Sequence, residues 1–168
     1  MSFDQILVAL DQTSLADQVF ERSVDLAIKY DARLLLLHCT NAVSDLVVNQ
    51  ALQPAGIAHP WPSTMLTERA PWETTAAARD IEQQQAQAAR QWLMQYQQQA
   101  QDLGCRKVDF DVRTGRPSEV INEVAQGVAA DLIVVGCRDR AGIEEFLLGS
   151  VSKSVVNHAS CAVLIVPQ

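Results

Sequence analysis

Apolar residues along this chain form short continuous runs, separated by longer stretches in which they recur every three or four positions. The continuous runs are residues 6–10, 34–39, 132–135 and 162–166. Such runs, without polar alternation, are typical of strands buried on both faces, as in a parallel sheet. Residues 107–113 alternate between polar and apolar side chains. They predict a half-exposed strand or an edge strand.

The stretches between these strands carry helical spacing. Helices are predicted over residues 19–30, 74–103 and 150–158, and over a segment that begins at Pro117, a residue favoured in the first turn. Gly104 is a suitable C-cap for the longest helix, whose polar face is rich in glutamine and predicts a solvated surface. Its expected apolar stripe consists of Ile81, Ala88, Trp92, Tyr96, Ala100 and Leu103.

Strands and helices therefore alternate from one end of the chain to the other. This order predicts an α/β fold, with one doubly wound domain over residues 1–168, a parallel sheet and helices on both faces. A length of 168 residues suits one domain. In such sheets ligands bind beyond the carboxyl ends of the strands, where the strand order reverses.

Residues 40–73 do not fit the alternation. They contain four of the six prolines together with Trp61 and Trp72. Loops of this length are uncommon in compact domains and are typical of lids, interaction segments or disorder. We interpret this stretch as a long loop or insert.

Charge and cysteine content narrow the function classes. The net charge of −7 argues against a non-specific binder of nucleic acid or of anionic membranes, because both require a basic surface. No secretory signal pattern and no apolar run of about 20 residues is visible, so we expect a cytoplasmic protein. The four cysteines form no C-x-x-C pair, which argues against zinc and predicts reduced thiols.

The strongest chemical signal lies between the fourth strand and the last helix. Gly136 follows the strand, and Gly149 and Ser150 open the helix. A strand, a glycine-marked loop and a helix N-terminus together form a common phosphate site, since backbone N–H groups and the helix dipole both favour an anion. The Walker pattern and the G-x-G-x-x-G pattern are both missing. A nucleotide bound by a different loop is the leading hypothesis.

Several polar residues have two readings at this level. Ser150 either caps the last helix or donates to a phosphate, and Asp11 either caps the first helix or contacts ribose or a metal ion. His38 lies in an apolar run and His158 near a helix C-terminus, so structural roles are expected for both. No nucleophile-elbow motif supports a hydrolytic triad.

Cys39 and Cys137 could in principle form a redox-active disulfide, but the expected strand order excludes this pairing. With the first strand between theirs, the two cysteines are two strand spacings apart, about 9–10 Å. That separation exceeds the roughly 7 Å between Cα atoms that a disulfide can bridge.

The motifs considered together resemble the universal stress protein family over nearly the whole chain. The resemblance rests on the segments ILVALD (6–11), LHC (37–39), TGRPSE (114–119), LLGSVS (147–152) and ASCAVLIV (159–166). It implies a five-stranded parallel sheet of order 3-2-1-4-5. It also implies a homodimer in which the last strand, which begins at Ala162 and ends at Val166, pairs with its copy in antiparallel orientation. That strand is apolar and carries no charge that would protect an exposed edge.

Members of this family that bind ATP or AMP carry Gly, two residues, Gly, nine residues and then Gly-Ser or Gly-Thr. Gly136, Gly149 and Ser150 match this pattern, but Asp139 occupies the position of the second glycine. A carboxylate about 5 Å from a phosphate charge repels it by roughly 3 kcal/mol at an effective dielectric of 20. Arg138 and Arg140 flank Asp139 and can offset this repulsion, or they can pair with nearby carboxylates instead. The departure allows a preference for the less charged AMP.

By motif position the resemblance also implies a role for each site residue. Asp11 is expected to contact ribose and Cys39 to lie beside adenine, with Ala9 near the base. The path of the ribose and phosphates is expected to be lined by Gly136, Arg138, Asp139, Arg140, Gly149, Ser150 and Val151.

These expectations lead to one preferred function and two rivals. The preferred function is a cytoplasmic dimeric stress sensor that binds AMP, or ATP accompanied by Mg²⁺; because no general base is evident, we expect at most slow ATP hydrolysis. The first rival is an interaction protein of the same fold that has lost nucleotide binding through Asp139 and presents Trp61 and Trp72 to a partner. The second is a nucleotide-using enzyme, for which Ser152 and Ser154 on either side of a lysine are only a weak signature.

Overall fold

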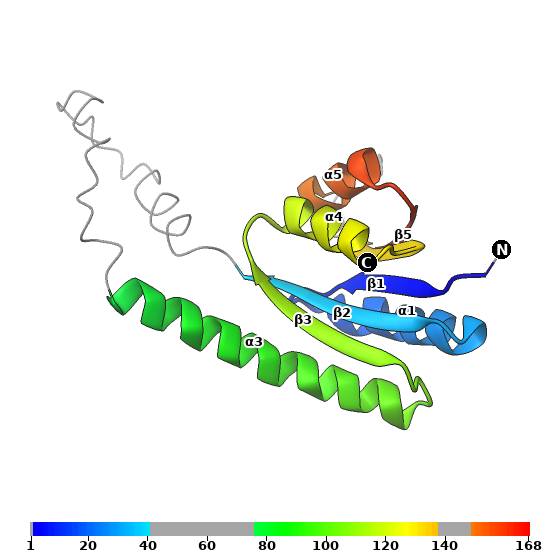
Figure 1. The fold of residues 1–168 in the computed structure, drawn as a ribbon, viewed down its shortest axis with the longest axis horizontal. Coiled ribbons are helices and arrows are strands. Elements are labelled where there is room, and N and C mark those ends of the chain that lie inside the picture. Colours follow the sequence, from blue (N-terminus) through cyan, green and yellow to red (C-terminus); the bar gives the residue numbers. More distant parts are fainter. Residues whose placement is uncertain (1, 41–75, 138–148) are drawn as a thin grey trace.

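The computed structural model describes residues 2–40, 76–137 and 149–168, and it shows the α/β architecture that the sequence predicts (Figure 1). Most of the predicted insert, residues 41–73, lies outside the described residues. The described elements are β1 (Gln5–Ala9), α1 (Ala16–Tyr30), β2 (Arg33–Thr40), α3 (Ala76–Asp102), β3 (Val108–Thr114), α4 (Pro117–Gly127), β4 (Leu132–Cys137), α5 (Ser150–His158) and β5 (Ala162–Pro167).

All five strands form one parallel sheet of order β3-β2-β1-β4-β5, which confirms the expected topology. β1 lies at the centre, and the chain moves to β2 and β3 on one side before it returns to β4 and β5 on the other. The strand order therefore reverses beside β1, and the carboxyl edge of β1 is the place where such sheets bind ligands.

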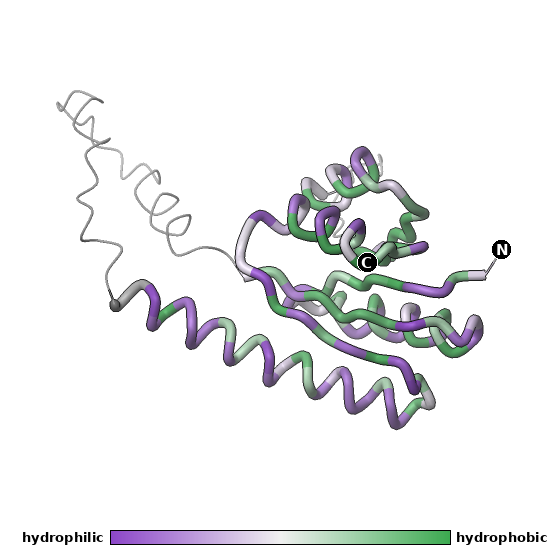
Figure 2. Tube along the Cα trace, viewed as in Figure 1, coloured by the Kyte–Doolittle hydropathy of each residue, from purple (hydrophilic) through white to green (hydrophobic). Residues whose placement is uncertain are grey.

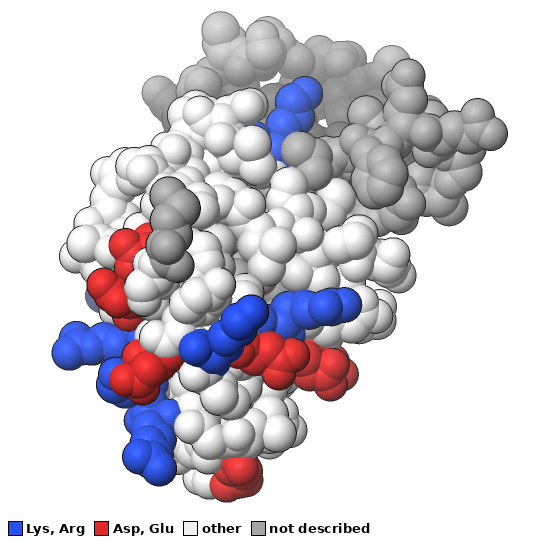
Figure 3. All heavy atoms as spheres, turned by 90° about the vertical axis from the view of Figure 1, so that its right-hand side faces the viewer, with Lys and Arg blue, Asp and Glu red and all other residues white. Residues whose placement is uncertain are grey.

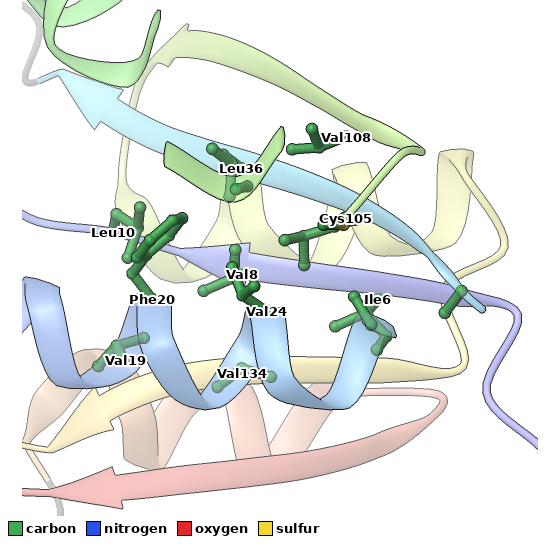
Figure 4. Packing of buried hydrophobic residues seen from close by; sticks show 14 of the residues in the cluster. Ile6, Val8, Leu10, Val19, Phe20, Val24, Leu36, Cys105, Val108 and Val134 are labelled. Carbon is green, nitrogen blue, oxygen red and sulfur yellow. The ribbon is translucent and has the colours of Figure 1, made fainter. Parts of the chain in front are cut away.

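Each face of the sheet has its own layer of helices and its own core. Alternate residues of the buried strands supply the two cores, since successive side chains of a strand point to opposite faces. Ile6, Val8 and Leu36 belong to the cluster beneath α1 and α3, which Figure 4 shows from close by. Leu7 and Leu37 belong to the cluster beneath α4 and α5.

The longest helix, α3, is only partly covered by the sheet. Its 27 residues extend over about 40 Å at 1.5 Å per residue, whereas the seven residues of β3 cover about 23 Å. Its N-terminal part therefore extends beyond the sheet (Figure 1). Ala89, Leu93 and Ala100 are fully buried, and Trp92 and Tyr96 are half-buried.

Half of the expected apolar stripe of α3 was wrong. Ile81 is 45% exposed and Leu103 is 59% exposed, and Ala88 is also exposed while its neighbour Ala89 is buried. The helix is mostly hydrophilic with scattered apolar residues along its length (Figure 2), so hydropathy marks no clear buried side. The position of the sheet decides which residues are covered.

Two predicted helix boundaries are confirmed. Gly104 follows α3 with a φ of +103°, and the amide of Cys105 donates to the carbonyl of Ala100 at 2.9 Å, which closes the helix end. Pro117 is the first residue of α4. Within the described ranges, no helix is long and apolar enough to cross a membrane.

Candidate nucleotide site

The carboxyl edge of the sheet brings together residues from three separate strands. Ala9, the last residue of β1, is the register partner of Leu37 on one side and of Val135 on the other. Asp11 and Cys39 each lie two residues beyond this row, and Gly136 lies one residue beyond it. The structure thus places the predicted residues of β1, β2 and β4 at one edge.

Three of the predicted residues share one face of the sheet. Ala9, Cys39 and Val151 are half-buried and pack against the apolar cluster beneath α4 and α5. Val151 comes from the first turn of α5. The N-terminus of α5 therefore adjoins the same face as the ends of β1 and β2.

The thiol of Cys39 is suited to packing rather than to chemistry. Burial, helped by the carboxylate of Asp111, raises the pKa of Cys39 from 9.0 to about 11. A nucleophilic or metal-binding cysteine needs its thiolate form, which this environment disfavours. Cys39 and Cys137 lie on β2 and β4 with β1 between them. This is the strand order on which the argument against a disulfide between the two cysteines depended.

Gly136 is a glycine for a structural reason. A Cβ atom there would lie 2.8 Å from Cδ2 of Leu15, the N-cap of α1, and 3.1 Å from a methyl group of Val19 in α1. The missing side chain allows the start of α1 to pack directly on the end of β4. This contact brings the loop that contains Asp11 close to the end of β4.

Gly149 differs in this respect. It precedes α5 with a φ of −57°, and a Cβ atom there would meet the hydroxyl of Ser152 at an ordinary van der Waals distance of 3.6 Å. The hydroxyl of Ser152 donates to the carbonyl of Gly149 at 3.0 Å. Neither backbone conformation nor packing among the described residues demands a glycine at this position.

Of the two roles that the sequence left open for Ser150 and for Asp11, the structure does not support the capping role. Gly149 is the N-cap of α5, and Ser150 is the exposed first residue of the helix. The N-cap of α1 is Leu15, whose first turn receives no side-chain cap within the described part of the chain. Asp11 instead accepts a hydrogen bond from the hydroxyl of Thr13 at 2.6 Å, within the loop between β1 and α1.

His38 anchors this loop, which agrees with the structural role expected from the sequence. Its Nδ1 donates to the carbonyl of Leu10 at 2.8 Å, and its ring contacts Trp92 of α3 edge-on with the centroids 5.2 Å apart. Sequence reasoning missed the partner on α3, because no local pattern relates the two residues. His158 likewise has a local role, with Nδ1 donating to the carbonyl of Ser154 in the last turn of α5.

The ends of β2 and β3 are joined beside the site. The hydroxyls of Thr40 and Thr114 lie 3.0 Å apart, and the amide of Gly115 donates to the carbonyl of Thr40 at 2.9 Å. Gly115 has a φ of +147°, which favours glycine. These ties hold the end of β2, and with it Cys39, in place.

The remaining predicted residues, Arg138, Asp139 and Arg140, lie outside the described residues. Among the residues that the structure does describe, no group of three or more histidine, cysteine, aspartate or glutamate side chains is arranged to hold a metal ion.

Comparison with known proteins decides the family. Residues 2–167 match the sequence profile of the universal stress protein family. This chain belongs to that family. A universal stress protein of Synechocystis sp., Sll1388, is 35% identical over 167 residues, which are 99% of each chain. A putative universal stress protein of Staphylococcus epidermidis is 27% identical over 169 residues, covering 99% of this chain and 85% of the relative.

Solved structures share the fold of this universal stress protein. UspA from Lactobacillus plantarum superposes with a TM-score of 0.71 at 21% identity, covering 99% of both chains. A universal stress protein in complex with cAMP superposes with a TM-score of 0.59 at 20% identity, covering 99% of this chain and 98% of the other. At these identities the likeness establishes the fold.

Proposed function

We propose that this universal stress protein binds an adenine nucleotide, ATP or AMP, at the carboxyl edge of β1, β2 and β4. The observation that carries the proposal is Gly149. Its missing side chain is not explained by backbone conformation or by packing of the described residues. A glycine at a helix N-terminus allows a phosphate to approach the backbone closely.

Each part of the site suits a part of such a ligand. Ala9, Cys39 and Val151 form a neutral, partly apolar surface that suits the face of adenine. The exposed carboxylate of Asp11 can accept hydrogen bonds from ribose hydroxyls. The N–H groups of the first turn of α5 and the exposed hydroxyl of Ser150 can bind phosphate oxygens.

The loop between β4 and α5 completes the proposal. Arg138 and Arg140 would pair with phosphate oxygens, while Asp139 would disfavour the more highly charged ATP. Mg²⁺ would enter with ATP, held chiefly by the phosphates, as is usual for this ion in nucleotide sites. A relative of the same fold in complex with cAMP supports an adenine nucleotide as the ligand class.

We also propose that two copies associate through β5. In the described sheet β5 pairs only with β4 and is an edge strand, and no residue of Ala162–Pro167 is charged. Val163, Leu164 and Ile165 are only half-buried in the single chain. An uncharged, apolar edge favours pairing with another strand.

In this proposal the protein acts by binding rather than by catalysis. Nucleotide occupancy would alter a surface that a regulatory partner contacts. We expect at most slow hydrolysis of ATP. The insert, residues 41–73, would belong to the same domain and contribute to that surface.

Calorimetry of the nucleotide-free protein with Mg·ATP and, separately, with AMP tests the proposal, with light scattering to measure the mass of the particle. We expect micromolar binding of at least one nucleotide by a dimer. A folded dimer that binds neither would contradict the nucleotide proposal. That result would favour the alternative that Asp139 motivates, an interaction protein of the same fold.

A further inference from the structure

A histidine behind the proposed nucleotide site connects it to the long helix α3. His38 lies on β2 directly before Cys39, but successive residues of a strand point to opposite faces. Cys39 packs on the side of α4 and α5, whereas the ring of His38 contacts Trp92 on the side of α3. His38 is therefore not expected to touch the ligand itself.

The hydrogen bond of His38 is made to the residue that precedes Asp11. A carbonyl oxygen can only accept, so Nδ1 of His38 carries the proton that it donates to Leu10 at 2.8 Å. The amide of Leu10 donates to the carbonyl of Leu37 at 2.9 Å. Both polar groups of Leu10 are thus held by consecutive residues of β2.

Helix α3 fixes the ring of His38. Trp92 contacts it edge-on, Tyr96 contacts Trp92 with centroids 5.0 Å apart, and Phe20 of α1 contacts Tyr96 at 4.8 Å. The hydroxyl of Tyr96 donates to the carboxylate of Asp17 on α1 at 2.6 Å. This row of rings joins α3 to α1 and limits the orientations available to the imidazole.

The hydrogen bond of His38 is made where β1 ends and the loop to α1 begins. Asp11, the residue after Leu10, is exposed. Within the loop the hydroxyl of Thr13 donates to the carboxylate of Asp11, and the amide of Ala16 donates to the carbonyl of Thr13. Leu10 itself is 3% exposed and lies in the core beside Phe20 (Figure 4). Leu10 is therefore the last residue held by the sheet before the carboxylate that the ribose would meet.

We infer that His38 is a positioning residue for the nucleotide site: it holds the carbonyl of Leu10 and thereby sets the place of the Asp11 carboxylate. The inference rests on the proposed nucleotide binding. The ring packing of His38 also contributes to stability, so the hydrogen bond and the ring must be tested separately.

Two substitutions separate these contributions. His38→Asn keeps an N–H donor at the position of Nδ1 but loses the ring that packs on Trp92. His38→Phe keeps an aromatic ring against Trp92 but leaves the carbonyl of Leu10 without this donor. Nucleotide affinity is measured by calorimetry well below the unfolding temperature of each variant, and amide hydrogen exchange is measured over residues 10–15 without nucleotide.

We expect His38→Phe to bind AMP or Mg·ATP about 3- to 10-fold more weakly, the effect of one lost hydrogen bond, and to exchange faster over residues 10–15. We expect His38→Asn to keep the wild-type affinity and slow exchange although its unfolding temperature falls. These opposite results distinguish positioning from packing. If His38 acted only through packing, the affinity would fall in His38→Asn, which loses the ring, and not in His38→Phe, which keeps one.

Three results would overturn the inference. The first is wild-type affinity and exchange in His38→Phe, and the second is an affinity loss in His38→Asn as large as that in His38→Phe. In both cases wild-type binding leaves the proposed function intact. The third is a wild-type protein that binds no nucleotide, which contradicts the proposed function as well; the exchange rates then still report whether His38 orders the loop.

Discussion

The two edges of the sheet are held in different ways. At the amino edge the carboxylate of Asp131 accepts hydrogen bonds from the amides of Asp4 and Gln5 at 2.8 and 2.9 Å. Lys107 pairs there with Asp31 at 2.7 Å. Side chains of both charges lie next to one another on this side of the molecule (Figure 3).

At the carboxyl edge the ends of the central strands carry small residues, while the ion pair of Arg113 with Asp111 lies to one side on β3. Ala9, Cys39, Gly136 and Gly149 lie near the strand ends or the start of α5, and His38 donates a hydrogen bond to the residue that begins the loop after β1. Small side chains leave space for a ligand, whereas the amino edge uses its side chains to join loops to one another. We therefore expect substitutions at the amino edge to lower the free energy of unfolding. At the carboxyl edge we expect some substitutions to lower nucleotide affinity and others to lower the free energy of unfolding.

Gly149→Val should produce the largest effect. A branched side chain at the start of α5 would occupy the space that a phosphate needs, so nucleotide affinity should fall by about a hundredfold or more, equivalent to about 2.7 kcal/mol. Because the fold does not demand a glycine there, the unfolding temperature and the proposed association through β5 should change little. Calorimetry, thermal unfolding and light scattering measure the three quantities. Unchanged affinity in the folded variant would contradict the site assignment.

Cys39 should resist alkylation. With its pKa raised from 9.0 to about 11, its thiolate fraction at pH 7.5 is about a hundredfold lower than that of an ordinary cysteine. Folding favours the neutral thiol, so its contribution to stability is complete below pH 9 and is lost as the pH rises from 9 towards 11. Mass spectrometry after iodoacetamide treatment at several pH values measures the rate at Cys39. Rapid labelling of the folded protein at pH 7.5 would contradict this environment.

Gly136→Ala should destabilise the fold without any ligand. The added methyl group would meet Leu15 at 2.8 Å, and overpacking of this kind costs about 1–3 kcal/mol of unfolding free energy. Denaturant unfolding measures the loss. Gly127→Ala is the matched control, because outside its own helix no atom of the described residues lies within 4 Å of its new Cβ, and it should be neutral or slightly stabilising. Equal stability of both variants would show that α1 does not need the glycine.

Asp131→Ala should have the smallest of these effects and should sharpen the contrast between the two edges. It removes the acceptor for the amides of Asp4 and Gln5, which should lower the free energy of unfolding by about 1 kcal/mol. Asp131→Asn retains one carbonyl oxygen and should lose less. Nucleotide affinity should not change in either variant. An affinity loss in Asp131→Ala would mean that the two edges are coupled.

Much of the fold could be predicted because burial leaves a local periodic signal. Strands covered on both faces, such as β1 and β4, are continuous apolar runs, and the half-exposed edge strand β3 alternates. Parallel alternation then places the end of every strand at one edge. Asp11, Cys39 and Gly136 could therefore be assigned to one edge from the sequence alone.

The sequence by itself thus determined the family, the order of elements and the edge that carries the candidate site, since each depends on local patterns and on the direction of the strands. Only the tertiary structure decided which side of α3 is buried and which residue caps α5. It determined that packing demands a glycine at position 136 but not at position 149. It also decided that His38 meets Trp92 and Leu10. These features depend on contacts between residues far apart in the chain, such as Leu15 with Gly136, and no local periodicity records such contacts.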